Sequence, residues 1–143
     1  MRPVSPEIIV WVLSFLGAVV VVLTRVRLGK ELDDGTKPVS RTILTVHTSV
    51  GLVAVVVWTL FLVFPPSSTL GGDLVGVAGL GLWWVTVFAG LGLLLRWLPS
   101  RGRHTSSLSE DEWAEGPGLS LLAHAGLLLG VLVFTWAFAT GTV

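Results

Sequence analysis

The sequence predicts an all-α protein, a bundle of four transmembrane helices that run up, down, up and down. The first indication is composition, because 52% of the 143 residues are hydrophobic and only 13% are charged. A soluble globular domain would hold about 25% charged residues, so this chain has too little polar surface to face water on all sides. The second indication is four uncharged stretches, each long enough to cross a hydrocarbon layer of about 30 Å. These stretches are residues 8–24, 42–64, 74–95 and 119–139.

The first stretch follows a helix-start pattern. Ser5 can cap the helix, Pro6 suits its first position, and Glu7 favours the positive end of the helix dipole. A cleavable signal peptide is the alternative interpretation of this stretch. However, the basic residues come after it, and no cleavage motif of small residues follows. We therefore expect a permanent membrane helix.

Basic residues set the expected orientation of the bundle. The connection 25–41 holds five Lys or Arg residues and the connection 96–118 holds three, whereas the remainder of the chain has only Arg2. By the positive-inside rule, both connections are cytoplasmic loops and both termini lie outside. The sequence thus predicts one integral domain over residues 1–143, embedded in the cell membrane with the lipid bilayer as its first partner.

Two of the expected helices carry a histidine in the membrane, His47 and His124. An ionisable side chain in hydrocarbon is costly and indicates a functional site by default. Both lie roughly 10 Å inside the cytoplasmic ends of helices that run in the same direction, so they share one depth. Counted from these histidines, Phe61 and Phe138 fall at matching positions, which indicates a faint internal repeat.

The two histidine-bearing helices should be diagonal neighbours, with axes roughly 11–14 Å apart. Two inward imidazoles leave room in that gap for one metal ion and for a tetrapyrrole plane around it, provided that the flanking helices are slender there. Small residues lie at comparable depth, namely Gly17, Gly51 and Gly90. They fit a slot for a haem, and they equally fit close helix packing, which glycine permits in membranes.

Further residues fit the surroundings of a haem. Ser120, one turn before His124, is a candidate acceptor for the ring nitrogen that does not face the iron. The basic residues near the same interface are candidate partners for the haem propionates, although membrane topology alone also accounts for them. These are Arg25, Arg41 and Arg96.

The runs TVHTSVGLVAVVVW (45–58) and LLAHAGLLLGVLVF (121–134) resemble the histidine-bearing helices of transmembrane b-type cytochromes. The resemblance is to the cytochrome b561-like group and to the haem-bearing anchor subunits of succinate dehydrogenases. It implies a haem b that exchanges electrons with quinone or a redox partner protein. With one intramembrane pair, His47 and His124, it implies one bis-His haem per chain, near the cytoplasmic side. The chain would then be an electron-transfer module or the membrane subunit of an oxidoreductase, joined to another membrane subunit or a second copy, and would bind no nucleic acid.

Other interpretations of the histidines remain open. Each ring is about as readily explained by packing, with a backbone carbonyl as its partner. A structural zinc site needs four ligands, and no Cys, Asp or Glu lies at that depth. A transporter is disfavoured because no carboxylate lies within any span. The main alternative function is a non-catalytic accessory subunit of a larger respiratory or transport complex, with its loops as docking surfaces.

Overall fold

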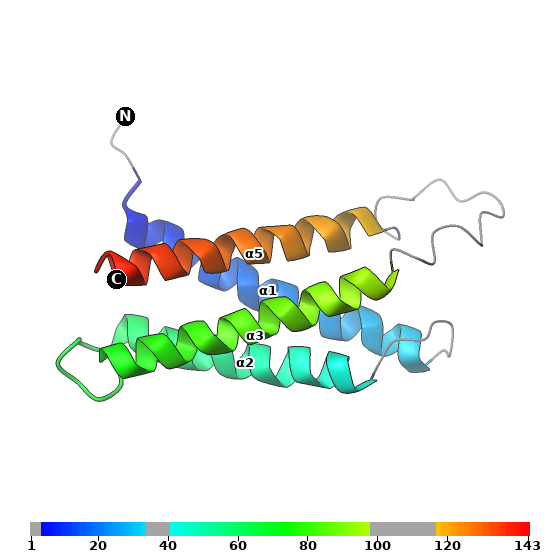
Figure 1. Cartoon of the computed structure of the whole chain (residues 1–143), viewed down its shortest axis with the longest axis horizontal. Helices are drawn as coiled ribbons and strands as arrows, with labels where there is room; N and C mark the ends of the chain where they lie inside the picture. The colour runs from blue at the N-terminus through cyan, green and yellow to red at the C-terminus, as the bar shows by residue number, and fades with distance from the viewer. Residues whose placement is uncertain (1–3, 34–40, 98–116) are drawn as a thin grey trace.

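The computed structural model describes residues 4–33, 41–97 and 117–143. In these ranges the regular secondary structure is entirely helical and forms a four-helix bundle (Figure 1). Each helix contains a segment long and apolar enough to cross a membrane. The predicted all-α, four-helix architecture is therefore confirmed. The helices are α1 (Pro6–Asp33), α2 (Arg41–Val63), α3 (Asp73–Trp97) and α5 (Pro117–Ala139).

Successive helices run antiparallel, as the up-down-up-down prediction requires. Figure 1 shows that the start of α1, the connection between α2 and α3, and the end of α5 gather at one end of the bundle, which we call the terminal end. Around the bundle, α1 packs on α2 and α5, while α3 packs on α2 and α5. The two histidine-bearing helices, α2 and α5, are thus diagonal. Which end faces the cytoplasm stays a prediction.

Three helices begin and end within two residues of the expected spans. The exception is α1, which was expected to end at residue 24 and continues to Asp33. Residues 25–33, expected in a loop, are therefore helical. The reason is that Arg, Leu, Lys and Glu, which dominate this segment, are good helix formers, so the backbone leaves the apolar span without unwinding. The part of α1 suited to crossing a membrane is Pro6–Gly29.

The start of α1 and the end of α5, both at the terminal end, have regular caps. At the start of α1 the Ser5 carbonyl accepts from the backbone N–H of Ile9 at 3.3 Å, the position expected of a helix cap. At the end of α5 the N–H of Thr142 donates to the Ala137 carbonyl at 2.8 Å, and that of Gly141 to the Phe138 carbonyl at 3.1 Å. Gly141 has a φ of 63°, the left-handed conformation that glycine adopts most easily. The chain therefore turns off α5 in a Schellman motif.

The core near the terminal end is aromatic. Trp58 and Phe134 stack with ring centroids 5.2 Å apart, and Phe134 meets Trp83 at 5.7 Å. Phe61 and Phe138, at matching positions after the two histidines, meet edge-on at 5.6 Å. Aromatic pairs of this kind contribute about 0.5–1.5 kcal/mol each beyond their buried area. We call these five residues the aromatic column.

One buried hydrogen bond ties the aromatic column to α1. The indole N–H of Trp58 donates to Ser14 Oγ at 3.1 Å, and the Ser14 hydroxyl donates to the Val10 carbonyl at 2.8 Å. The indole N–H is thus satisfied inside an apolar core, where an unpaired donor would cost about 1–3 kcal/mol. On the opposite side of the bundle, Trp84 of α3 donates to Thr135 Oγ1 of α5 at 3.2 Å.

Candidate functional site

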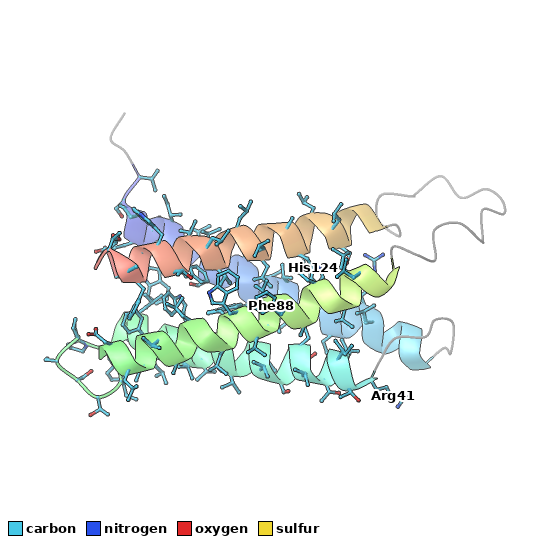
Figure 2. The ribbon with its side chains drawn as sticks, in the orientation of Figure 1. Arg41, Phe88 and His124 are labelled. Carbon is cyan, nitrogen blue, oxygen red and sulfur yellow. The ribbon has the colours of Figure 1, made fainter. Side chains whose placement is uncertain are left out.

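His47 of α2 and His124 of α5 meet inside the bundle. Their ring centroids are 6.0 Å apart and the ring planes are inclined by 42°. The side chain of His47 is fully buried and that of His124 is 4% exposed. Figure 2 shows His124 in the half of the bundle nearer to Arg41 and the start of α2, away from the terminal end. Two imidazoles from diagonal helices therefore share one depth and one enclosed space.

The helical period explains why both histidines point inward. On α2, His47 belongs to a stripe of buried residues that recur at intervals of three and four, which is the inward face of a packed helix. His124 begins a similar stripe on α5. The stripe on α2 comprises Leu44, His47, Gly51, Ala54, Trp58 and Phe61, and that on α5 comprises His124, Leu127, Val131, Phe134 and Ala137.

Gly90 of α3 borders both rings. A Cβ atom added at this position would lie 2.7 Å from Cδ2 of His124, and 3.1 Å from Nε2 of each histidine. The absence of a side chain at Gly90 therefore provides the space in which the rings meet. It also shows that the Nε2 atoms of His47 and His124 converge on one small region beside the α3 backbone. Of the three glycines proposed for a haem slot, Gly90 is thus placed at the rings.

The other two glycines face different side chains. A Cβ at Gly51 would lie 2.8 Å from a methyl carbon of Val21 and 3.1 Å from that of Thr86. A Cβ at Gly17 would lie 2.8 Å from the indole of Trp83. In this structure the nearest groups to Gly51 and Gly17 are therefore packed side chains, which agrees with the helix-packing interpretation of these two positions.

The hydrogen bonding of His124 identifies its tautomer. Nδ1 of His124 lies 2.7 Å from the backbone carbonyl oxygen of Ser120, one turn earlier. A carbonyl can only accept, so Nδ1 carries the hydrogen and donates it. The lone pair of the neutral ring is then on Nε2, the nitrogen that faces Gly90 and His47. Ser120 is the predicted partner of this ring, and it acts through its main chain.

Three buried imidazole nitrogens lack a hydrogen-bond partner in the part of the chain that the structure describes. They are Nδ1 and Nε2 of His47 and Nε2 of His124. A buried polar atom left without a partner costs about 1–3 kcal/mol, so three on two neighbouring rings call for an explanation. A metal ion bound between the two Nε2 atoms would satisfy two of the three.

Two histidines are the protein ligands that a haem iron would need, but a Cβ at Gly90 would lie 3.1 Å from both Nε2 atoms, so a haem could enter only if α3 moved away from the rings. Two imidazoles bound through Nε2 to one metal ion at about 2 Å place their ring centroids roughly 6 Å apart, the separation observed here. Within the described ranges no group of three or more His, Cys, Asp or Glu side chains is placed to hold a metal. Structural zinc needs four ligands from the protein. A haem supplies four nitrogen ligands of its own, so a pair of histidines is sufficient.

The predicted propionate partners lie toward the same end as the histidines. Arg41 is the first residue of α2, six residues before His47 and hence about 9 Å away along the helix axis. Arg41 and Arg25 are both exposed. The side chain of Arg96 and the connection 98–116 lie outside the described residues. Pairing of these arginines with propionates stays a prediction.

Trp83, to which the sequence assigned no role, is a core residue. Its side chain is fully buried against Phe134, and its indole Nε1 has no hydrogen-bond partner among residues 4–33, 41–97 and 117–143. A signal for this placement was present in the spacing of α3, because Trp83 lies seven residues before Gly90 and so on the same face of the helix. Trp84 lies off that face and is half-buried.

The chain was compared with protein-family models, with curated proteins and with solved structures, and none of the three comparisons found a significant match.

Proposed function

We propose that this chain is a membrane b-type cytochrome that holds one haem b between His47 and His124. The single observation that carries the proposal is the convergence of two buried Nε2 atoms, both without a protein partner in the described ranges, beside the bare backbone of Gly90. The separation of the rings supports it, since it suits one metal ion between them. The resemblance of the two helices to those of b-type cytochromes agrees with this choice.

A haem b exchanges single electrons with a partner, so the function proposed is electron transfer within the membrane. The chain is then an electron-transfer module, or the membrane subunit of an oxidoreductase, with a quinone or a redox protein as its partner. The protein would supply the two imidazole nitrogens of His47 and His124 to hold the group, would keep His124 in one tautomer through Ser120, and would enclose the site in apolar side chains. Axial ligands, hydrogen bonding and burial are the features by which a protein tunes the potential of a haem.

The burial of the two histidines supports electron transfer as the function and disfavours direct binding of a substrate at this site. Leu44 and Val87, which share the inward faces of α2 and α3 with the site residues, are almost completely buried. Water is therefore kept from the histidine pair on these sides. A dry surrounding of this kind suits a centre that changes charge by one unit and binds no substrate directly.

The direct test is the absorption spectrum of the purified protein from cells with ample haem. We expect a low-spin b-type spectrum that sharpens on reduction with dithionite, with about one haem per chain. His47→Ala and His124→Ala should each remove or convert this spectrum. His104→Ala, which changes the third histidine of the chain, is the matched control and should leave it intact. A well-folded preparation without haem would refute the proposal and favour the accessory-subunit alternative.

A further inference from the structure

The space between the two imidazoles is bounded on one side by bare backbone. Gly90 of α3 has no side chain, and a Cβ added there would lie 3.1 Å from Nε2 of both His47 and His124. The ring centroids are 6.0 Å apart, a separation that suits one ion bound about 2 Å from each Nε2. A macrocycle around such an ion requires α3 to move away from the rings. A bare ion requires only that position 90 carries no side chain, so the bundle as it stands suits an ion by itself.

The small number of ligands narrows the choice of metal. Within the described ranges no group of three or more His, Cys, Asp or Glu side chains is placed to hold a metal. The hydroxyl of Thr48, next to His47, donates to the Leu44 carbonyl at 2.8 Å. The buried hydroxyl of Thr86 likewise donates to a carbonyl of its own helix at 2.8 Å. Structural zinc needs four ligands, and calcium and magnesium take oxygen ligands. The ion must therefore be one that two nitrogen ligands satisfy.

The apolar surroundings limit the charge of that ion. The four uncharged spans hold no Asp or Glu, so no carboxylate on them can act as a counter-ion at this depth. Both ligands are imidazoles, which are neutral when they bind a metal through a lone pair. The cost of burying an uncompensated charge is high and, in the Born description, rises with the square of the charge. A singly charged ion is therefore favoured over a doubly charged one.

We infer that His47 and His124 of the haem-free bundle form a two-coordinate site for copper(I). Copper accepts imidazole nitrogen, and its monovalent form has a filled d shell and is stable with two donors in a line. The lone pair of His124 is on Nε2, because its Nδ1 donates to the Ser120 carbonyl at 2.7 Å. His47 supplies the second lone pair from Nε2, which has no protein partner in the described ranges. Binding forms two nitrogen–copper bonds, transfers no electron and releases no proton.

The copper site does not rest on the haem proposal. The two groups use the same rings with α3 in different places, copper(I) with Gly90 against the imidazoles and haem with α3 displaced. They should therefore exclude each other in one chain, so haem-loaded protein should take up no copper(I). The failure of one proposal leaves the other to be judged by its own measurement.

The test uses the full-length protein, produced in cells that cannot make haem, and copper(I) itself as the probe. Copper(I) is titrated without oxygen against the coloured chelator bicinchoninate. We expect one copper per chain, with the X-ray absorption edge of two-coordinate copper(I), and no displacement by equimolar zinc(II). His47→Ala and His124→Ala should each lose this binding. His104→Ala, which changes the third histidine of the chain, is the matched control and should keep it.

Gly90→Ala tests the space between the rings while both ligands remain. A methyl group 3.1 Å from both Nε2 atoms would press on an ion held between them. We expect copper(I) to bind at least about 10-fold more weakly, the smallest loss typical when the surroundings of metal-binding histidines are changed. Gly92→Ala is the matched control, because a Cβ there would meet nothing within 4 Å, and it should bind copper(I) as the wild type does. The helical circular dichroism of each variant establishes that it is folded.

Three outcomes would overturn the inference. The first is folded, haem-free wild-type protein that takes up no copper(I), and this arm requires no variant to fold. The second is an absorption edge that shows three or four ligands on the copper. The third is copper binding that persists in both His→Ala variants. Haem binding in haem-sufficient cells, combined with any of these outcomes, would leave the cytochrome proposal in place. Copper(I) binding by a protein that never takes up haem would refute the cytochrome proposal alone.

Discussion

Gly90 of α3 and His124 of α5 are in such close contact that a methyl group does not fit between them. A Cβ built on Gly90 would stand 2.7 Å from Cδ2 of His124, and side-chain carbons in proteins essentially never approach so closely. The position of the imidazole therefore depends on the missing side chain of a residue 34 positions earlier in the chain. Glycine inside a helix lowers helix stability by about 1 kcal/mol relative to alanine, so its presence here has a steric reason.

Gly90→Ala should displace the His124 ring or the α3 backbone. Crowding of this kind in a packed core costs typically about 1–3 kcal/mol, and we expect a lower thermal unfolding temperature in detergent together with an altered or weakened haem spectrum. Gly92→Ala is the matched control, because a Cβ there would meet nothing within 4 Å. It should be neutral or stabilising by up to about 1 kcal/mol. Equal stability of the two variants would contradict the role given to Gly90.

Ser120→Ala should leave the haem spectrum unchanged. The hydrogen bond to His124 uses the main-chain carbonyl of Ser120, and this group persists when the hydroxyl is removed. The measurement is the reduced-minus-oxidised absorption spectrum of the purified variant with its haem content. A substantial loss of haem would show that the hydroxyl itself takes part in holding the ring.

His47→Ala and His124→Ala should combine in a non-additive way. If one iron is held by both histidines, removing either one should release the haem or change its spectrum. The double variant should therefore bind scarcely less haem than the more damaging single variant. Haem titration of the two single variants and the double variant supplies the full cycle. Strictly additive effects on affinity would indicate that the histidines act at separate sites.

Ser14→Ala should destabilise the bundle through the unpaired indole of Trp58. The substitution leaves a buried N–H without its acceptor, which costs about 1–3 kcal/mol. In a Trp58→Phe background, where no N–H remains to be satisfied, the same change should have little effect. A double-mutant cycle of unfolding free energies measures this coupling. If Ser14→Ala costs the same in both backgrounds, the hydrogen bond contributes nothing measurable.

Membrane topology can be tested independently of any cofactor. Reporter fusions after Arg27 and after Arg103 should indicate the cytoplasm, and a fusion after Val143 should indicate the outside, because eight of the nine basic residues lie in or beside the two predicted inner connections. The opposite result for Val143 would place the histidine pair near the outer face. The bundle geometry would be unaffected, but the predicted access of the site to cytoplasmic partners would be wrong.

The four helices and their order could be predicted from the sequence because uncharged stretches of spanning length leave little choice of structure. The end of α1 was predicted too early, at residue 24, because the first charged residues were taken as the end of the helix. They mark where the chain leaves the apolar span, and the helix itself continues to Asp33. The meeting of His47 and His124 followed from depth and topology, both of which are regular properties of an antiparallel bundle.

Details of the site could not be predicted in the same way. Which of several glycines borders the rings depends on the rotation of each helix about its axis, and packing against the neighbouring helices sets that rotation. The sequence therefore did not distinguish Gly90 from Gly17. In the structure Gly90 contacts the two histidines, whereas Gly17 contacts the indole of Trp83. The bond from His124 to the Ser120 carbonyl likewise involves a main-chain group, which every residue at that position would supply.

Most of the aromatic column lies far from the two histidines along the helices. Trp58 follows His47 by eleven residues on α2, about 16 Å along the helix, which exceeds the separation of roughly 7–10 Å within which substitutions usually influence one another. A protein engineer can therefore fuse a reporter to the terminal end, or rebuild its turn, without disturbing the histidines, whereas Trp83, only seven residues from Gly90 on α3, should be left in place. Conversely, the surroundings of the histidines can be redesigned while the distant aromatic packing continues to hold the four helices in register.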